Sequence, residues 1–189
     1  MARSTMATLI GYVRDLIGDP SPAPSGCSLQ FSDDSIQAVL DQHRTDVFQY
    51  RLEEADDIQT TGVVAWKAFY AQKPFWETGA VMQNNSWAVV VPTTAYEIEG
   101  RWVFATTQTK LPYWITGSYY DVYAAACDLL RRWVGAVKLD FDFSQVNAAY
   151  HRSQKVRALQ ELIKLYQQRQ PLRRIRLPRR DSANIGRRW

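Results

Sequence analysis

Few side chains in this 189-residue chain stand in a local arrangement that is typical of acid–base or metal chemistry. The only histidines, His43 and His151, lack the sequence-local Asp, Cys or Ser spacing that is typical of a catalytic site. Carboxylates cluster at 52–57 (LEEADD) and 139–142 (LDFD), but the first cluster lacks the glycine turn and ligand spacing of a calcium loop. We therefore interpret both histidines as structural and both clusters as solvated acidic loops.

The cysteines and the short motifs give no sign of catalysis. Cys27 and Cys127 lie far apart and in no CxxC or Cys/His spacing, which predicts reduced thiols and neither a zinc site nor a disulfide framework. The chain contains no GxxxxGK[ST], GxGxxG after a strand, or GxSxG motif, so nucleotide-binding and hydrolase functions have no local support. We expect no enzyme activity, no cofactor and no metal site.

Arginine is concentrated at the carboxyl end. Residues 171–189 carry seven arginines against one aspartate, a net charge of +6, whereas residues 1–170 carry 16 basic and 18 acidic side chains, a net of −2. A folded nucleic-acid-binding face would itself be basic, so the pattern indicates a nearly neutral folded body followed by a basic arm.

Three interpretations of this arm compete: a solvated tail, a segment that docks on another protein, and a DNA contact in which binding depends steeply on salt. We favour docking, because guanidinium groups pair bidentately with carboxylates and because apolar side chains alternate with the arginines. The docking candidates are Arg173, Arg174, Ile175, Arg176, Leu177, Arg179, Arg180, Arg187, Arg188 and Trp189.

Composition and length predict one domain, or one domain with an insertion, because 46% of the residues are hydrophobic and can fill one sizeable core. No leader with a cleavage site precedes the first helical pattern, and no apolar run approaches the length of a membrane span. We expect a soluble protein that is not exported and has no membrane partner.

Apolar residues recur with helical period in four segments, and these predict helices at 6–17, 33–43, 119–137 and 152–169. Ser4 or Thr5 can cap the first helix, and Gly18 stops it. Ser32 and the acidic residues after it favour the start of the second helix. Pro171 ends the last helix, because proline lacks the amide donor and biases its predecessor out of the helical region. Between the last two helices we expect a turn.

The segment from 44 to 118 has the alternating and β-branched runs that are typical of strands, and it contains five of the seven tryptophans. The clearest hairpin pairs 94–98 with 101–106 around Glu99-Gly100, where glycine can take a positive φ. We predict an α+β fold with the divisions 1–43 (two helices), 44–118 (β-rich insertion), 119–170 (two helices) and 171–189 (basic arm).

The carboxyl-terminal third, "YYDVYAAACDLLRRWVGAVKLDFDFSQVNAAYHRSQKVRALQELIKLYQQRQPLRR", resembles the head-to-tail connector adaptor, or head-completion, proteins of tailed bacteriophages. The segment "LIGYVRDLIGDP…FSDDSIQAVL" is similar to the opening of the same family. The resemblance covers 5–43 and 119–170. The β segment of about 75 residues departs from the shortest members, which carry only a small hairpin there.

The resemblance implies a helical bundle, and together with the β-rich segment and the basic arm it leads us to predict a four-helix adaptor core interrupted by a β-rich insertion between the second and third helices, with an extended basic arm. It implies a structural virion protein: one subunit of a ring, commonly of twelve subunits, that joins the capsid portal to the tail. Its partners would be the portal, a tail or stopper/tail-terminator protein, other copies of itself, and genomic DNA that passes through the lumen without sequence-specific binding. It would lie in the neck of the virion, and in the host cytoplasm during assembly.

A ring subunit needs complementary lateral surfaces, and large aromatic side chains often dominate such interfaces. We therefore take six tryptophans as ring-interface candidates: Trp66, Trp76, Trp87, Trp102, Trp114 and Trp133. A slightly acidic body would also let a DNA duplex slide. The main alternative is a non-enzymatic nucleic-acid-binding protein that grips phosphates with its arm.

Overall fold

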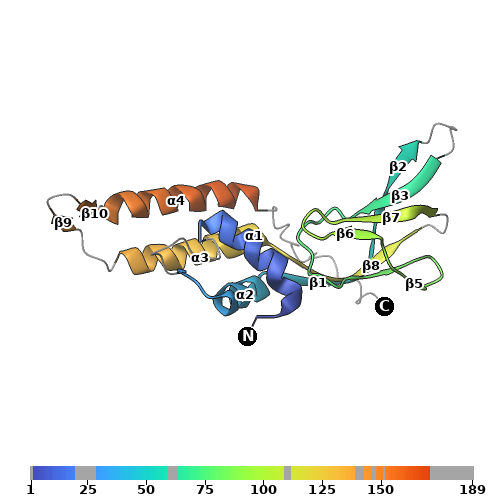
Figure 1. Ribbon diagram of the computed structural model, residues 1–189, viewed down its shortest axis with the longest axis horizontal. Helices are drawn as coiled ribbons and strands as arrows, with labels where there is room; N and C mark the ends of the chain where they lie inside the picture. The colour runs from blue at the N-terminus through green and yellow to red at the C-terminus, as the bar shows by residue number, and fades with distance from the viewer. Residues whose placement is uncertain are drawn as a thin grey trace, which may run out of the picture.

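The helices and the two four-stranded sheets occupy opposite ends of an elongated molecule, and a separate pair of short strands lies at the helical end (Figure 1). The computed structural model describes residues 2–19, 29–58, 64–108, 112–138, 143–145, 148–150 and 152–170. The helices are η1 (Ser4–Met6), α1 (Ala7–Ile17), α2 (Asp33–Gln42), α3 (Val122–Val137) and α4 (Arg152–Arg169). The strands are β1 (Arg44–Arg51), β2 (Glu53–Ile58), β3 (Val64–Tyr70), β4 (Val81–Gln83), β5 (Val89–Val90), β6 (Thr94–Tyr96), β7 (Arg101–Gln108), β8 (Trp114–Tyr120), β9 (Phe143–Gln145) and β10 (Ala148–Tyr150).

The helical end is built around α3. Ala125 and Ala126 are fully buried and Ala124 nearly so, and these small side chains let α1, α2 and α4 pack against it. Buried Arg14 joins the end of α1 to the start of α2, because its guanidinium donates to Asp19 Oδ2 at 3.0 Å and to Asp33 Oδ1 at 2.7 Å. A buried guanidinium needs such partners, so the three side chains fix the angle between the two helices.

Eight of the strands form two antiparallel four-stranded sheets, and β9 and β10 pair as a separate hairpin. Sheet A has the order β1-β8-β4-β5 and sheet B the order β2-β3-β7-β6. They share a hydrophobic core of their own, which contains Phe69, Trp76, Met82, Trp102 and Ile115 and is separate from the helical core. Connection to the helices is direct, because α2 continues into β1 after His43 and β8 continues into α3 after Tyr120. Thus the paired strands β1 and β8 join the two ends of the molecule.

The structure is α+β, but the predicted arrangement of helices is wrong. A 3₁₀ helix comes first, and a β-hairpin of β9 and β10 separates α3 from α4 where we expected a turn. Strands β1–β8 lie between α2 and α3 in the sequence, and they build two sheets around a core of their own that is separate from the helical core. Helical periodicity could not reveal strands of three residues, because so few positions carry no period. The predicted arm lies outside the described residues.

Local details also differ from the sequence predictions. Neither Ser4 nor Thr5 caps α1 through its side chain, whereas Ser32 caps α2 by accepting from the Ser35 amide. The helix predicted from 119 begins at Val122, because the two preceding tyrosines belong to β8. In the β6–β7 hairpin the strands end at Tyr96 and restart at Arg101, so the turn has four residues; Gly100 takes the expected positive φ of 68°.

Candidate functional site

The outer face of sheet A is an exposed surface of apolar side chains. Met82 and Ile115 point into the core and are 1% and 0% exposed. Side chains alternate along a strand, so the neighbours of these two residues on β4 and β8 point outward. The apolar residues of this outer face are Val81, Trp87, Val89, Val91 and Trp114, of which Val89 is 63% and Val91 81% exposed, and the polar Gln83 and Thr116 lie on the same face. Such exposure costs free energy in an isolated subunit, and grouped apolar side chains of this kind mark interaction surfaces.

A tight loop between β4 and β5 holds Trp87 on this face. Asn84 is buried, and its Oδ1 accepts from the Ser86 amide at 3.0 Å, the Ser86 hydroxyl at 2.9 Å and the Ala88 amide at 3.1 Å. Trp87 has φ of 60°, an unfavourable conformation for a bulky residue, and its ring stacks on Trp114 with centroids 6.0 Å apart. The loop therefore fixes an exposed tryptophan at a strained position, a pattern that is typical of binding sites.

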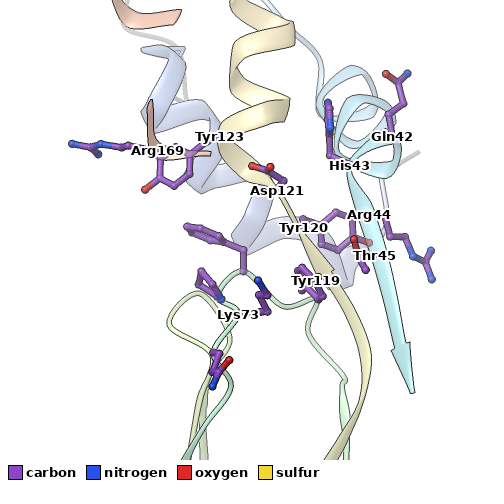
Figure 2. Close-up of a pocket in the computed structure, with 13 residues that line it drawn as sticks. Gln42, His43, Arg44, Thr45, Lys73, Tyr119, Tyr120, Asp121, Tyr123 and Arg169 are labelled. Carbon is purple, nitrogen blue, oxygen red and sulfur yellow. The ribbon is translucent and has the colours of Figure 1, made fainter. Parts of the chain in front are cut away.

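A pocket of about 440 Å³ lies at the junction of the helices and the sheets (Figure 2). Its lining includes three cations, Arg44, Lys73 and Arg169, and an aromatic wall. Asp121 also lines the pocket, and its carboxylate caps α3 by accepting from the Ala124 amide at 3.0 Å. The pocket thus has a mixed cationic and aromatic lining.

His43 at the rim of this pocket forms the pair most like a catalytic arrangement. Its Nε2 lies 2.8 Å from Asp128 Oδ2. Burial opposes ionisation of Asp128, but hydrogen bonds from His43 and Arg131 outweigh it and hold the pKa of this carboxyl below its ordinary value. The pocket lining includes no serine or cysteine, and within the described residues no hydrogen bond joins His43 to a hydroxyl that it could activate. The pair thus links α2 to α3.

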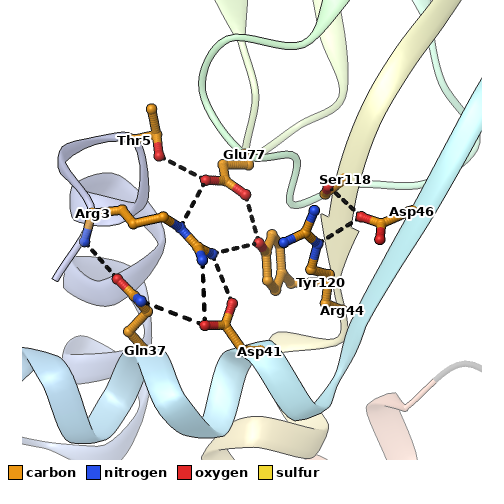
Figure 3. Close-up of polar contacts among 9 residues, drawn as sticks. All are labelled: Arg3, Thr5, Gln37, Asp41, Arg44, Asp46, Glu77, Ser118 and Tyr120. Atoms are coloured by element: carbon orange, nitrogen blue, oxygen red, sulfur yellow. Dashed lines mark hydrogen bonds and ion pairs between the residues drawn. The ribbon is translucent and has the colours of Figure 1, made fainter.

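A polar network clamps the helical end onto the sheets (Figure 3). Arg3 donates to Asp41 Oδ1 of α2 at 2.7 Å and to the Tyr120 hydroxyl of β8 at 3.2 Å. Glu77 accepts from the Tyr120 hydroxyl and from the Thr5 hydroxyl, both at 2.6 Å. Since these residues come from the N-terminal segment, α2, the 71–80 segment and β8, their bonds fix the two ends of the molecule relative to each other.

The network also shifts two pKa values. Burial raises the pKa of Tyr120 well above its ordinary value, and the hydrogen bond to the Glu77 carboxylate adds to this effect. Burial opposes ionisation of Glu77, yet hydrogen bonds from Thr5 and Tyr120 and the charge of Arg3 lower its pKa below the ordinary value. At neutral pH the network therefore contains a phenol and a carboxylate.

The tryptophans predicted at a ring interface lie in different environments. Trp76 and Trp102 are 1% and 2% exposed, and their rings meet edge to face in the core of the sheets. Trp66, Trp114 and Trp133 are partly buried, and Trp87 is the most exposed of the six. The structure brings together Trp87 and Trp114 as a surface pair, and sets Trp133 against Phe31 in the helical end.

Other predicted residues fall beyond the described part of the chain. All ten docking candidates belong to 171–189, which the structure does not describe. His151 and the acidic cluster at 139–142 also lie outside the described residues. The acidic cluster at 52–57 is not a loop, because strand β2 begins at Glu53. Within the described ranges, no group of three or more His, Cys, Asp or Glu side chains could hold a metal ion.

The sequence predictions missed the outer face and the polar network. A signal for the outer face was present in Val89, Val90 and Val91, three valines before a proline, because a short strand followed by proline is typical of a sheet edge. The network had no such signal, since Arg3 and Tyr120 are joined only by the fold.

Comparisons with known proteins identify no relative: no protein-family model, no curated protein and no solved structure matches the chain. Among the described residues, no helix is long and apolar enough to cross a membrane.

Proposed function

We propose that the protein is a structural, non-enzymatic subunit of a ring that joins a bacteriophage capsid portal to the tail and surrounds the path of the DNA. The observation that carries this proposal is the outer face of sheet A, where Val89, Val91 and Trp87 are exposed together. An exposed apolar patch held on a rigid sheet fits a protein that is complete only when assembled.

The distribution of exposed apolar side chains also supports an assembly role. Nine large hydrophobic side chains among the described residues are exposed, and seven belong to the segment between α2 and α3: Phe48, Tyr70, Val81, Trp87, Val89, Val91 and Tyr96. The helical end exposes fewer. We assign the sheets to the tail-side partner and the basic arm to the portal, where arginines would pair with carboxylates. The protein would then lie in the virion neck, and in the host cytoplasm during assembly.

Electron microscopy of the purified chain, alone and mixed with portal, tests this function. We expect closed rings, commonly of twelve subunits, either in solution or bound to portal. A chain truncated after Gln170 should form the same rings but bind portal much more weakly, because it lacks the seven arginines of the arm. Particles that stay monomeric under all conditions, with no portal binding, would refute the proposal.

A second candidate function is non-enzymatic nucleic-acid binding, which the arm and the exposed cations of α4 favour. Lys155, Arg157 and Lys164 are exposed along this helix. Phosphate binding would make the affinity for duplex DNA fall steeply with salt. A mobility-shift titration of the full chain and of the truncated chain at several salt concentrations distinguishes the two functions, because the ring subunit should show no such steep dependence.

A further inference from the structure

Two helices lie on opposite sides of the helical end. α3 packs against both α2 and α4, and it lies between them (Figure 1). Each of these outer helices buries one face against the core and turns the other outward. The outward faces are therefore two lateral surfaces of the molecule that point in different directions.

The outward face of α4 is basic and carries an apolar side chain. Leu159 and Tyr166 are buried, whereas a stripe on the opposite side is exposed. We name this the α4 stripe: Arg157, Ala158, Glu161, Lys164 and Leu165. Leu165 is 43% exposed and is the only large hydrophobic side chain so exposed in a described helix. Over its whole length α4 has five basic residues and one acidic residue.

The outward face of α2 has the opposite character. Ile36, Val39 and Leu40 are buried, and the exposed residues on the other side form the α2 stripe: Asp34, Ala38 and Gln42. The helix contains three aspartates and no basic residue; Asp33 and Asp41 are paired within the chain with Arg14 and Arg3, and Asp34 is the carboxylate that belongs to the stripe. The small side chain of Ala38 makes a shallow depression at the middle of the stripe. Asp34 lies one turn before it and Gln42 one turn after it.

We propose that the α4 stripe of one copy packs on the α2 stripe of a second copy, head to tail. Leu165 would cover Ala38, and Lys164 and Arg157 would face Asp34 at the start of α2. Each copy has one stripe of each kind on opposite sides, so the contact repeats from copy to copy and closes into a ring if the rotation permits. This inference rests on the proposed function and names the lateral surfaces of the proposed ring.

The composition of the α4 stripe favours a protein over DNA as its partner. Glu161 would repel phosphates, and Leu165 would gain nothing from them. The α4 stripe and the α2 stripe are complementary in charge and lie on the same chain. A second copy of the chain is therefore the partner that matches both.

Cysteine cross-linking tests the contact even when association is weak. In a background with Cys27 changed to serine, we expect the double variant Ala38→Cys with Leu165→Cys to give a ladder of covalent oligomers under mild oxidation. Either single variant should stop at the monomer or dimer, because each then offers one kind of cysteine to its neighbour. Cys127 is buried and serves as the silent internal control.

Charge reversal gives an independent measurement by analytical ultracentrifugation in low salt. Asp34→Lys and Lys164→Glu should each raise the protein concentration needed for half-assembly by about tenfold or more, because each puts like charges opposite one another. An equimolar mixture of the two variants should assemble again, since each altered stripe then finds its complement. Glu99→Lys, an exposed change in the β6–β7 turn, is the matched control.

The outcomes separate this inference from the proposed function. The inference is wrong if rings form, the double cysteine variant gives no ladder of covalent oligomers, and neither charge reversal changes assembly. That result would leave the proposed ring function unaffected. A monomer that neither cross-links nor binds portal would overturn both. If Lys164→Glu weakens duplex DNA binding and leaves self-association unchanged, the α4 stripe is a nucleic-acid surface and the inference is wrong.

Discussion

Glu77 shows how single residues connect the two ends of the molecule. Its carboxylate accepts from Tyr120 in β8 and from Thr5 in η1, and it lies 3.3 Å from the Arg3 guanidinium. These partners favour the ionised form more strongly than burial opposes it, so the pKa of Glu77 is lowered. A carboxylate that is ionised and satisfied in this way stabilises the junction only while it stays charged.

We predict that Glu77→Gln lowers the free energy of unfolding by about 2 kcal/mol near neutral pH, because hydrogen bonds to a charged acceptor are lost. Since its pKa in the folded state lies below the ordinary 4.5, the stabilisation is fully present above that pH and is lost as pH falls through the lower value. Urea unfolding should therefore separate wild type from variant near neutral pH and much less in acid. Glu99→Gln, at an exposed carboxylate, is the control; an equal gap at both pH values would contradict the argument.

Among the helices and strands, the sequence predicts those in which apolar residues recur with a regular period over many positions. The last helix was predicted at its observed bounds, and Gly18 ends α1 as expected; the structure adds that Gly18 takes the left-handed conformation. The start of α3 was placed too early, because Tyr119 and Tyr120 fit the end of a strand and the start of a helix equally well. The hairpin of β9 and β10 was missed because its strands have three residues each.

The candidate site was less predictable than the elements. Tryptophan-rich strands indicated a core or an interface, but the choice between the two depends on which face of the sheet each residue occupies. Trp102 faces the shared core, whereas Trp114 faces outward next to Trp87. Register fixes that choice, and one residue of slip would reverse it.

Asn84 gives a prediction at this scale. Asn84→Ala removes the acceptor of three hydrogen bonds in the β4–β5 loop, so the amides of Ser86 and Ala88 lose their side-chain partner. We expect the free energy of unfolding to fall by about 1–3 kcal/mol and Trp87 to leave its stacked position on Trp114. Urea unfolding measures the first effect. For the second, the change in tryptophan fluorescence that Asn84→Ala causes is compared with the change that Trp114→Phe causes. The exposed change Ser86→Ala removes one of the three donors and should cost less.

The whole molecule presents two surfaces that respond to salt in opposite ways. Contact between the α4 stripe and the α2 stripe depends on charge, which added ions screen. Contact through the outer face of sheet A depends on apolar burial, which sulfate strengthens because it is excluded from the protein surface. The two kinds of association can therefore be separated in one protein by the choice of salt.

We predict that Val89→Glu combined with Val91→Glu abolishes sulfate-promoted association and leaves low-salt assembly unchanged. Both valines are more than half exposed, so the double variant should fold with a melting temperature close to that of wild type. Light scattering of wild type and variant across a sulfate series, with sedimentation in low salt, measures both effects. Val89→Thr with Val91→Thr keeps the β-branched shape without charge and should fall between them. If the glutamate variant associates in sulfate as strongly as wild type, the outer face is not the apolar contact surface, and the assignment of this sheet to a partner fails with it.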